Sequence, residues 1–269
     1  MQSQSLAGRV ALVVGGGQEP GGAVGMGRAA AVTLARAGAR VIVGDRNPTA
    51  AEETAEAIRT EGGTASTVTI DVSDEDSIAA ALGDVEETEG RLDVLHNNVG
   101  VSVGAGDSAL ASITPEVFDR VTNINLRGMV LTCKHAIPLM ARSGGGSIIS
   151  VGSTAPMTHY EQIAYKTSKA GVIAMSENIA WFHAGEGIRS NVVIPGLIDT
   201  PMAIDTRVRL SGRPREELIE ERSRKIPLGR KIGTAWDVAD AVLFFASDQS
   251  SFVTGQHIVV DGGWTLQVG

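Results

Sequence analysis

The sequence is poor in cysteine, and Cys133 is the single copy among 269 residues. An intramolecular disulfide, a cysteine-based zinc cluster and a Cys-x-x-Cys redox pair are therefore excluded. The five histidines are scattered, with no His-x-x-x-His pattern that would recruit a metal, so we expect no metal site. Cys133 falls in an apolar helical stretch, where we expect a buried thiol without a catalytic role. Other side chains must supply any chemistry.

The sequence also lacks a long apolar run and an excess of positive charge. No stretch approaches the ~20 apolar residues that a membrane-spanning helix needs, and the first residues lack the apolar core of a secretion signal. The formal net charge of −8 and the pI near 5.2 argue against a nucleic-acid or anionic-membrane surface. We therefore expect a cytoplasmic protein that binds neither nucleic acid nor membrane.

Apolar runs alternate with amphipathic stretches along the whole chain. Seven runs predict buried strands: Val10–Val14, Arg40–Gly44, Ala65–Ile70, Leu92–His96, Ser147–Val151, Ser190–Ile194 and His257–Val260. The stretches between them predict helices at Gly27–Ala37, Thr49–Thr60, Glu75–Glu87, Pro115–Met140, Tyr165–Ala184 and Trp236–Ala246. Strands without strict alternation suit a parallel sheet that helices cover on both faces. The pattern predicts an α/β fold, a single doubly wound Rossmann-type domain over residues 1–269 with about seven parallel strands.

One segment, residues 196–228, breaks this rhythm. It contains a mixed-charge helix candidate, Pro214–Lys225, where a short connection is typical. Such an insertion is either a lid or a solvated spacer. Because it follows a predicted strand at the carboxyl edge, where open α/β sheets bind their ligands, we interpret it as a substrate lid.

A glycine-rich loop follows the first predicted strand. Gly25-x-Gly27-x-x-Ala30 fits the dinucleotide-binding pattern, in which small residues let the backbone approach the pyrophosphate and the helix start offers free N–H donors. Asp45 ends the second predicted strand, 20 residues after Gly25, where a carboxylate binds the ribose 2′-hydroxyl. That carboxylate would repel the 2′-phosphate of NADP, so we expect NAD. Arg46 supports NADP as the alternative, because its guanidinium would receive the phosphate if Asp45 turned away.

Tyr165 and Lys169 form a Tyr-x-x-x-Lys pair on a predicted helix. Residues four apart share a helix face, so the Lys169 ammonium can favour the ionised form of a phenol whose ordinary pKa is near ~10. The alternative is an ordinary surface pair. Ser153 upstream, with Ser150 as the fallback hydroxyl, and Asn125 earlier still favour a proton-relay site.

These features together resemble the short-chain dehydrogenase/reductase family from about Gly8 to Leu266. The catalytic set of that family is matched by Ser153, Tyr165 and Lys169. Asp71-Val72 is similar to its adenine-flanking pair, Asn97–Gly100 to its Asn-Asn-Ala-Gly segment, and Asn123–Asn125 to the segment with its helix asparagine. Gly187–Asn191 is similar to the end of its sixth strand, Pro195–Thr200 to its nicotinamide-contacting segment, and Val259–Gly263 to its closing strand.

The resemblance implies that Tyr165 exchanges a proton with the substrate oxygen while hydride moves between the carbinol carbon and nicotinamide C4. Ser153 would hydrogen-bond the substrate oxygen, Lys169 would lower the Tyr165 pKa and bind the nicotinamide ribose, and Asn125 would hold a water that leads to solvent. The Ile198 backbone and Thr200 would orient the carboxamide. The cofactor-binding residues implied in this way are Gly15, Gly25, Met26, Gly27, Asp45, Arg46, Asp71, Val72, Asn97, Val99, Tyr165, Lys169, Pro195, Gly196, Ile198 and Thr200.

The sequence departs from the family pattern in the glycine loop. Gly15 lies ten residues before Gly25, about six more than is usual, and an alternative alignment uses Gly21 in its place. Val99 replaces the usual alanine, so it either crowds the adenosine side or fills a core gap. Enoyl reductase relatives also have lengthened glycine loops, but their tyrosine and lysine lie farther apart than Tyr165 and Lys169, which favours the carbonyl/alcohol branch.

Three variable segments are expected to contact the substrate: Val101–Asp107, Thr154–Ile163 and residues 196–228. Within them we single out His159, Tyr160 and Met202, although a loop histidine is commonly a surface residue. Four arginines of the third segment, with glutamates nearby, favour solvated ion pairs, so we expect no carboxylate or phosphate handle. They are Arg207, Arg209, Arg213 and Arg215.

The leading hypothesis is an NAD-dependent secondary-alcohol dehydrogenase or ketone reductase that acts on a small molecule. The alternatives are an NADP-linked ketoreductase on acyl or polyketide-type substrates and a non-catalytic NAD-sensing regulator. Similar proteins build oligomers from the outer faces of the helices predicted at Pro115–Met140 and Tyr165–Ala184, so we expect a homotetramer. Trp181-Phe182 and Gly262–Leu266 would either extend such interfaces or pack in the core.

Overall fold

Seven parallel strands form one sheet in a computed structural model that describes residues 4–18 and 20–266. The strand order across the sheet is β3-β2-β1-β4-β5-β6-β9. The strands are β1 (Val10–Val14), β2 (Arg40–Asp45), β3 (Thr64–Thr69), β4 (Val94–Asn97), β5 (Gly146–Val151), β6 (Ile188–Pro195) and β9 (His257–Val260). All seven predicted strands are confirmed, with small differences at their ends.

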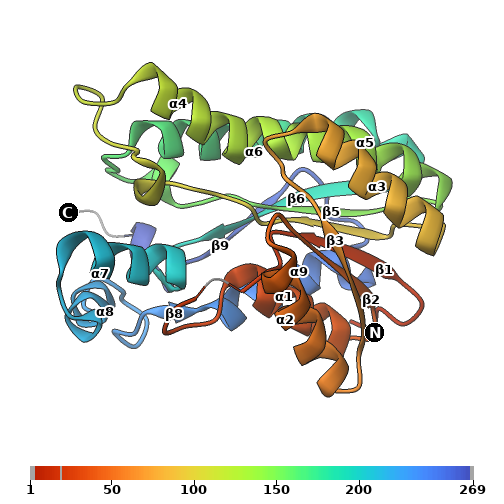
Figure 1. Cartoon of the computed structure of the whole chain (residues 1–269), viewed down its shortest axis with the longest axis horizontal. Coiled ribbons are helices and arrows are strands. Elements are labelled where there is room, and N and C mark those ends of the chain that lie inside the picture. The colour runs from red at the N-terminus through yellow and green to blue at the C-terminus, as the bar shows by residue number, and fades with distance from the viewer. Residues whose placement is uncertain (1–3, 19, 267–269) are drawn as a thin grey trace.

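Helices cover both faces of this sheet (Figure 1). One layer contains α3 (Glu75–Glu89), α4 (Pro115–Thr122), α5 (Gly128–Arg142) and α6 (Ile163–Phe182), and the other contains α1 (Met26–Arg36), α2 (Pro48–Thr60) and α9 (Ala235–Ala246). In β1, Ala11 and Val13 pack in one core cluster while Val10, Leu12 and Val14 pack in another. Because neither face of β1 meets water, the strand is apolar throughout, and the predicted doubly wound fold is confirmed.

Local sequence signals set the helix ends. The Asn47 side chain accepts from the amides of Thr49 and Ala50 at the start of α2, and Asp74 accepts from the Asp76 amide at the start of α3. Gly90 ends α3 in the left-handed region at φ 66°, which a residue with a side chain rarely adopts. Such capping groups satisfy backbone donors and acceptors that would otherwise be unpaired.

The single helix predicted over Pro115–Met140 is interrupted. A π-helical turn, Asn123–Arg127, separates α4 from α5. The wider turn leaves irregular backbone, a feature that is frequent at functional sites. The Asn125 side chain is fully buried there and hydrogen-bonds the loop that follows β4. The prediction of one continuous helix was wrong. A π-helical turn contains one residue more than an α-helical turn, and this small change does not show in the hydrophobic periodicity of the sequence.

The chain reverses its direction of winding between β1 and β4. From β1 it proceeds outward through β2 and β3, and from β4 it proceeds the other way through β5, β6 and β9. β1 and β4 are adjacent, with Val14 beside Asn97 at their carboxyl ends. Loops that leave these two strands diverge, which opens a crevice for ligands at this edge of the sheet.

Residues 196–228 contain more structure than the one helix predicted there. They include β7 (Ile198–Asp199), a π-helical turn (Pro201–Asp205), α7 (Thr206–Ser211) and α8 (Arg215–Ser223). β7 pairs with β8 (Gly233–Thr234) in a separate two-stranded sheet. Ile204, Ile226 and Ile232 form a small core of their own beneath these elements. Figure 1 shows α7 and α8 lying together at one end of the molecule.

The lengthened glycine loop contacts residues 196–228. Arg215 forms ion pairs with Asp199 and, at 3.0 Å, with Asp205, and the Gly22 amide donates to Asp205 Oδ2 at 3.0 Å. A Cβ at Gly21 would lie 2.2 Å from Asp205 Oδ2, and one at Gly22 would lie 2.7 Å from Arg215 Nε. The extra loop residues therefore need to be small to reach α7 and α8.

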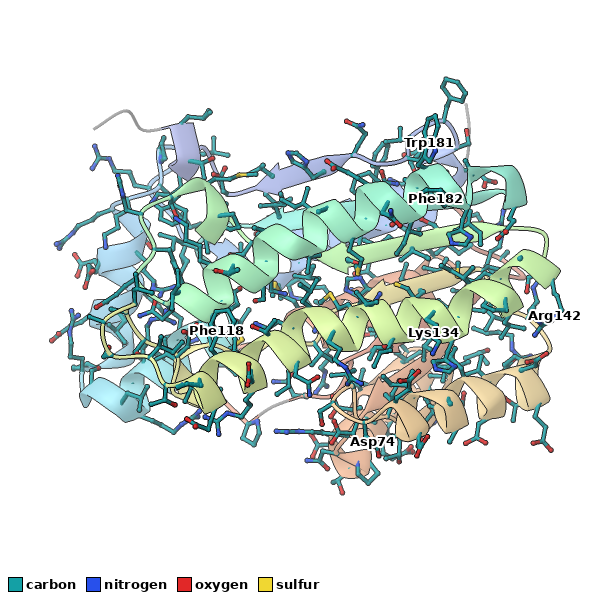
Figure 2. All side chains as sticks on the ribbon, turned by 90° about the horizontal axis from the view of Figure 1, so that it is seen from above. Asp74, Phe118, Lys134, Arg142, Trp181 and Phe182 are labelled. Carbon is teal, nitrogen blue, oxygen red and sulfur yellow. The ribbon has the colours of Figure 1, made fainter. Side chains whose placement is uncertain are left out.

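Two large apolar side chains at the end of α6 are exposed. Trp181 is 80% exposed and Phe182 is 68% exposed, and Figure 2 shows both at one end of the helix row. Core packing, one of the two alternatives for these residues, is therefore wrong. Their role in an interface stays a prediction.

Replacing Arg215 by methionine is expected to loosen the contact between the glycine loop and α8. The change leaves the largely buried carboxylates of Asp199 and Asp205 facing each other without a cation. We expect a loss of about 1–3 kcal/mol in the free energy of unfolding and faster amide hydrogen exchange in both the loop and α7.

The matched control is Arg213→Met, because the pairs of Arg213 with Glu217 and Glu221 are exposed. Its expected cost is below about 1 kcal/mol. Urea unfolding and hydrogen exchange compare the two variants. Equal losses, or exchange that changes in α7 but not in the glycine loop, would contradict the proposed contact.

Candidate functional site

Two adjoining cavities occupy the crevice at the carboxyl ends of the strands. The glycine-loop cavity, of about 190 Å³, is lined by the turns after β1, β2 and β4, and the tyrosine cavity, of about 380 Å³, is lined by the loops after β4, β5 and β6 together with α7 and α8. Tyr165 belongs to the walls of both. Both cavities are also lined by Met26, Arg46, Gly100, Val101, Ile124, Thr200 and Met202.

Close backbone packing shapes the glycine-loop cavity. Gly15 has φ 79°, a conformation that favours glycine, and a Cβ there would lie 2.8 Å from Val99 Cγ2. A Cβ at Gly27 would lie 1.9 Å from the Gly15 carbonyl oxygen, to which Asn98 Nδ2 also donates at 2.9 Å. Gly15 and Gly27 thus face each other inside the cavity, whereas Gly21 lies outside it against Asp205. The structure favours the alignment that uses Gly15.

The start of α1 opens into the same cavity. Gly25 is its N-cap residue and offers no side-chain cap, while Met26 and Gly27 line the cavity wall. The first amides of a helix have no intrahelical acceptor, so a phosphate can accept from them and also gains from the helix dipole. The space left by the glycines and the free amide groups at the start of α1 together fit a dinucleotide pyrophosphate.

Asp45 lies at the end of β2 in the cavity wall. Its Oδ2 accepts from the Gly17 amide and its Oδ1 from the Asn47 amide, each at 3.0 Å. A carboxylate oxygen has two acceptor positions, so both can accept a further hydroxyl. Arg46 beside it is exposed and lines both cavities. The Asp45 carboxylate, which favours NAD, and the Arg46 guanidinium, which favours NADP, therefore both line the glycine-loop cavity.

Asp71, Val72 and Val99 line another part of the glycine-loop cavity. Hydrogen bonds from Ser73 lower the pKa of Asp71, so its carboxyl is ionised at neutral pH. Val99 also packs against the core cluster beneath the sheet. The side chain therefore fills a core gap, as one of the two alternatives states, and crowding of the adenosine side stays a prediction.

Tyr165, Ser153 and Lys169 come together where the cavities meet. The Ser153 hydroxyl lowers the pKa of the Tyr165 phenol, and Lys169 Nζ lies 5.8 Å from the Tyr165 ring centroid. Lys169 Nζ donates to the Val151 carbonyl oxygen at 2.7 Å. All three side chains are at least nine-tenths buried. The carboxyl end of β5 carries Val151 and Ser153, and the first turn of α6 carries Tyr165, so two adjacent elements build this group.

Burial dominates the protonation of this group. It raises the pKa of Tyr165 to about 12, aided by the nearby Tyr160, while Ser153 and Arg207 act in the opposite direction. Burial also lowers the pKa of Lys169 to about 7. Lys169 is not among the groups that shift the Tyr165 pKa here, so the expectation that it lowers this pKa stays a prediction.

Asp107 fixes the start of α6, and sequence reasoning missed this role. Its Oδ1 accepts from the Ala164 amide at 3.2 Å and its Oδ2 from the Tyr165 amide at 2.7 Å. Gln162, the N-cap residue of α6, provides no side-chain cap. An aspartate 58 residues away in the chain therefore supplies the capping carboxylate. No local pattern could have shown this contact.

Asn125 lies beside this group without lining either cavity. Its Oδ1 accepts from the Val101 amide at 2.7 Å, and its Nδ2 donates to the Val101 carbonyl oxygen and to Ser168 Oγ. These contacts tie the loop after β4 to α6. Both amide hydrogens are used, so the expected water link between Asn125 and Lys169 stays a prediction.

The structure brings most of the predicted site residues together. Pro195, Gly196, Ile198 and Thr200 line the tyrosine cavity, with Tyr160 and Met202. Asn97 is an exception, because it is buried and its Nδ2 donates to Cys133 Sγ at 3.3 Å. Its neighbour Asn98 lines the glycine-loop cavity instead. The run Asn97-Asn98 contains the signal, but only the register of β4 decides which residue faces the crevice.

Two further candidates lie outside the cavities. His159 is exposed and lines neither, so the alternative of a surface histidine holds. Ser150, the fallback for Ser153, is fully buried, and its Oγ has no partner among the described residues. Cys133 is buried as expected, which raises the pKa of its thiol to about 12.

The described residues contain neither a candidate metal site nor a candidate membrane-spanning helix. In residues 4–18 and 20–266, no group of three or more His, Cys, Asp or Glu side chains is placed to hold a metal ion. Within the same ranges, no helix is both long and apolar enough to cross a membrane.

Lys169 is expected to make stability depend on pH. Its pKa falls from an ordinary 10.5 to about 7 in the folded chain, so the unfolded chain binds more protons between these values and stability rises with pH across that window. Below about pH 7 both states are charged and the full cost of burial remains. Lys169→Met removes the cost, so its stability relative to the unmodified protein should decline from about pH 7 to about pH 10.

Urea unfolding of both proteins across this range measures the difference. Lys134→Met is the control, since Lys134 is exposed and pairs with Glu75. A stability difference for Lys169→Met that does not change with pH, or that changes as it does for Lys134→Met, would refute the buried-lysine argument.

Sequence comparison places these features in a known family. The family model described as "Enoyl-(Acyl carrier protein) reductase" matches residues 21–265. The chain is 36% identical to the 7alpha-hydroxysteroid dehydrogenase of Clostridium sardiniense, over 97% of this chain and 95% of that one. It is also 36% identical to the cis-4-hydroxycyclohexanecarboxylate dehydrogenase of Sinomonas cyclohexanicum, over 97% and 98%. Equal identity to relatives with different names leaves the substrate open.

The fold agrees with these matches. A solved structure from Burkholderia xenovorans, described as that of a short-chain dehydrogenase/reductase, superposes with a TM-score of 0.91 at 37% identity and covers 98% of this chain and 99% of that one. The seven-stranded order, the cavity at its carboxyl edge and the sequence matches lead to one conclusion. The chain belongs to the short-chain dehydrogenase/reductase family of oxidoreductases.

Proposed function

We propose that this chain, as one NAD-binding domain, transfers hydride between NAD(H) and a secondary alcohol or ketone, with Tyr165 as general acid and base. One observation carries the proposal: Ser153 and Tyr165 both line the tyrosine cavity, and the Ser153 hydroxyl lowers the pKa of the Tyr165 phenol, which also lines the glycine-loop cavity. A substrate oxygen in the tyrosine cavity would meet two hydroxyl groups at once. That arrangement suits an oxygen that gains and loses a proton.

During alcohol oxidation, the substrate O–H proton passes to the phenolate oxygen of Tyr165, which becomes the hydroxyl, as the carbinol C–H bond breaks with its electron pair. When bound, the nicotinamide supplies the hydride acceptor for oxidation and the hydride donor for reduction. Ser153 donates to the substrate oxygen and stabilises negative charge that develops there. In ketone reduction the same Tyr165 hydroxyl returns its proton to the oxygen.

Lys169 is proposed to assist this proton exchange. A pKa of about 7 lets it gain or lose a proton near neutrality, and a charged ammonium favours the phenolate form of Tyr165. It lines the glycine-loop cavity, where it can also bind the ribose of the cofactor. Asn125 is proposed to extend the path through a water to solvent.

The remaining cofactor residues follow the two cavities. We propose that Gly15, Gly25 and Gly27 hold the pyrophosphate and that Asp45 binds the adenosine ribose. Asp71 and Val72 would flank the adenine, while the loop from Pro195 to Thr200 would hold the nicotinamide end. NAD is favoured, because Asp45 faces the glycine loop through its bond to Gly17 and a 2′-phosphate there would meet a carboxylate.

An NADP-linked ketoreductase is the second candidate, and exposed Arg46 at the cavity wall favours it. A regulator that binds NAD without turnover would not need buried Ser153, Tyr165 and Lys169 side chains around a substrate-sized cavity. We further propose a cytoplasmic homotetramer, with exposed Trp181 and Phe182 available to an interface.

The names of relatives support an alcohol substrate. Both the hydroxysteroid and the hydroxycyclohexanecarboxylate enzymes are named for dehydrogenation of a hydroxylated compound. Tyr165 and Lys169 also keep the spacing that favours the carbonyl/alcohol branch over enoyl reduction. A cavity of about 380 Å³ has room for a small or medium-sized molecule.

Tyr165→Phe is the decisive variant. Purified protein is incubated with NAD or NADP and a pool of secondary alcohols, and NADH or NADPH formation is followed by absorbance. We expect turnover with NAD and a loss of at least about a hundredfold in the variant, because the proton acceptor is gone. NADH should bind the variant nearly as well.

Retained turnover in Tyr165→Phe would refute the assignment of the proton donor. A higher kcat/KM with NADP would overturn the preference drawn from Asp45 and favour the second candidate. NADH binding without turnover of any alcohol or ketone would favour the regulator.

A further inference from the structure

Positive charge gathers in the tyrosine cavity without a matching negative charge. The described residues that line it include five arginines and no aspartate or glutamate: Arg46, Arg120, Arg207, Arg209 and Arg222. The whole chain has a net charge of −8, so this local excess runs against its overall composition. A concave surface of one sign concentrates ligands of the opposite sign.

The other basic side chains of α8 and its flanks are neutralised. Arg213, Arg215, Arg224 and Lys225 each form an ion pair with a carboxylate. The expected solvated ion pairs are therefore found for Arg213, while Arg215 pairs in a more buried place. Arg207 and Arg209 do not follow that expectation, since neither pairs with a carboxylate in the described part of the chain.

Arg207 and Arg222 differ from the remaining cavity arginines in being half-buried. Arg207 Nη1 donates to the Ala203 carbonyl oxygen at 2.8 Å, which leaves most of its donors unused. For the Arg222 guanidinium, no hydrogen bond or ion pair is found within residues 4–18 and 20–266. A half-buried guanidinium without a partner is costly unless a ligand supplies the acceptor.

The two guanidinium groups also act on each other and on the tyrosines. Burial, and after it the charge of Arg207, lowers the pKa of Arg222 to about 10, while Tyr160, Glu221 and Asp199 act in the opposite direction, so Arg222 remains protonated at neutral pH. Arg207 acts on Tyr165 in the same way, lowering the pKa of its phenol. Tyr160 packs on the Tyr165 ring with centroids 5.5 Å apart and lines the same cavity. The arginines and the reacting hydroxyl therefore serve one binding space.

We propose that the substrate is a secondary alcohol or ketone that carries an oxyanion, either a carboxylate or a phosphate ester, and that Arg207 and Arg222 bind this group. The inference rests on the proposed dehydrogenase function and specifies its substrate class. It revises the expectation that the site has no anion handle. Guanidinium forks match the planar pairs of oxygens on such groups, and the anion removes the repulsion between the two cations. Residues 196–228 thereby select the substrate.

Binding of unreactive probes tests the anion site apart from turnover. Full-length protein saturated with NADH is titrated with cyclohexanecarboxylate, cyclohexanecarboxamide or inorganic phosphate in a calorimeter. We expect an oxyanion to bind at least about tenfold more tightly than the neutral amide, because only the anion forms charge-assisted hydrogen bonds. Carboxylate binding identifies a hydroxy acid, and binding of phosphate alone identifies a phosphorylated alcohol.

Arg222→Gln is the cleaner variant, because the Arg222 guanidinium has no hydrogen bond or ion pair with the described residues that the change would remove. It should weaken oxyanion binding at least about tenfold and raise KM for a hydroxy acid, with little change in kcat or in KM for the methyl ester of that acid. Arg207→Gln should do the same and also shift the pH profile of kcat, since Arg207 lowers the Tyr165 pKa. Arg224→Gln is the control, because Arg224 is exposed and pairs with Glu220 on the same helix.

Equal affinity for the carboxylate, the amide and phosphate would overturn the proposal, and so would variants that weaken acid and ester alike. Failure of the dehydrogenase assignment has a different signature. In that case no alcohol turns over in a Tyr165-dependent way, whereas oxyanion binding still requires Arg222.

Discussion

The geometry of the site depends on one carboxylate. Asp107, in the loop after β4, accepts from the first free amides of α6 and so fixes where that helix begins. Tyr165 is one of the two residues whose amides it holds, and Lys169 follows one turn later on the same face. A shift of α6 by one residue would turn the phenol away from Ser153. The interaction is buried, so water does not compete for the carboxylate, and it joins elements that follow two different strands.

A second constraint is the close approach of the glycine loop to the loop after β4. Gly27 touches the Gly15 carbonyl, Gly15 touches Val99, and Asn98 closes the group with a hydrogen bond to Gly15. The first two contacts require glycine, because an added Cβ would lie 1.9 Å from the Gly15 carbonyl oxygen at Gly27 and 2.8 Å from Val99 Cγ2 at Gly15. The amides at the start of α1 are thereby left open to a ligand rather than covered by protein. Packing and ligand access are thus set by the same small residues.

Much of this fold could be read from the sequence because strands that are covered on both faces leave uninterrupted apolar runs, as in β1 and β5. Hydrophobic periodicity reports on neighbouring residues only. It therefore located the strands and helices but missed the features that depend on contacts between residues far apart in the sequence. The π-helical turn around Asn125, the capping of α6 by Asp107 and the choice of Asn98 over Asn97 all depend on neighbours far along the chain. The grouping of Ser153, Tyr165 and Lys169 was predictable because a parallel sheet brings its carboxyl ends to one edge. Their pKa values were not, since burial follows from the whole fold.

The charged side chains of residues 196–228 differ in the partners that they contact. Side chains of α8 that face solvent pair with neighbours one turn away, an arrangement that helical spacing alone produces. Arg215 instead reaches Asp199 and Asp205, which binds the segment together and gives Gly22 an acceptor. Arg222 pairs with neither group of carboxylates, and no described Asp or Glu lines the cavity to which it belongs. An unpaired half-buried cation does not stabilise the folded chain, and the proposed binding of a substrate oxyanion beside the Tyr165 hydroxyl would supply the missing partner of Arg222.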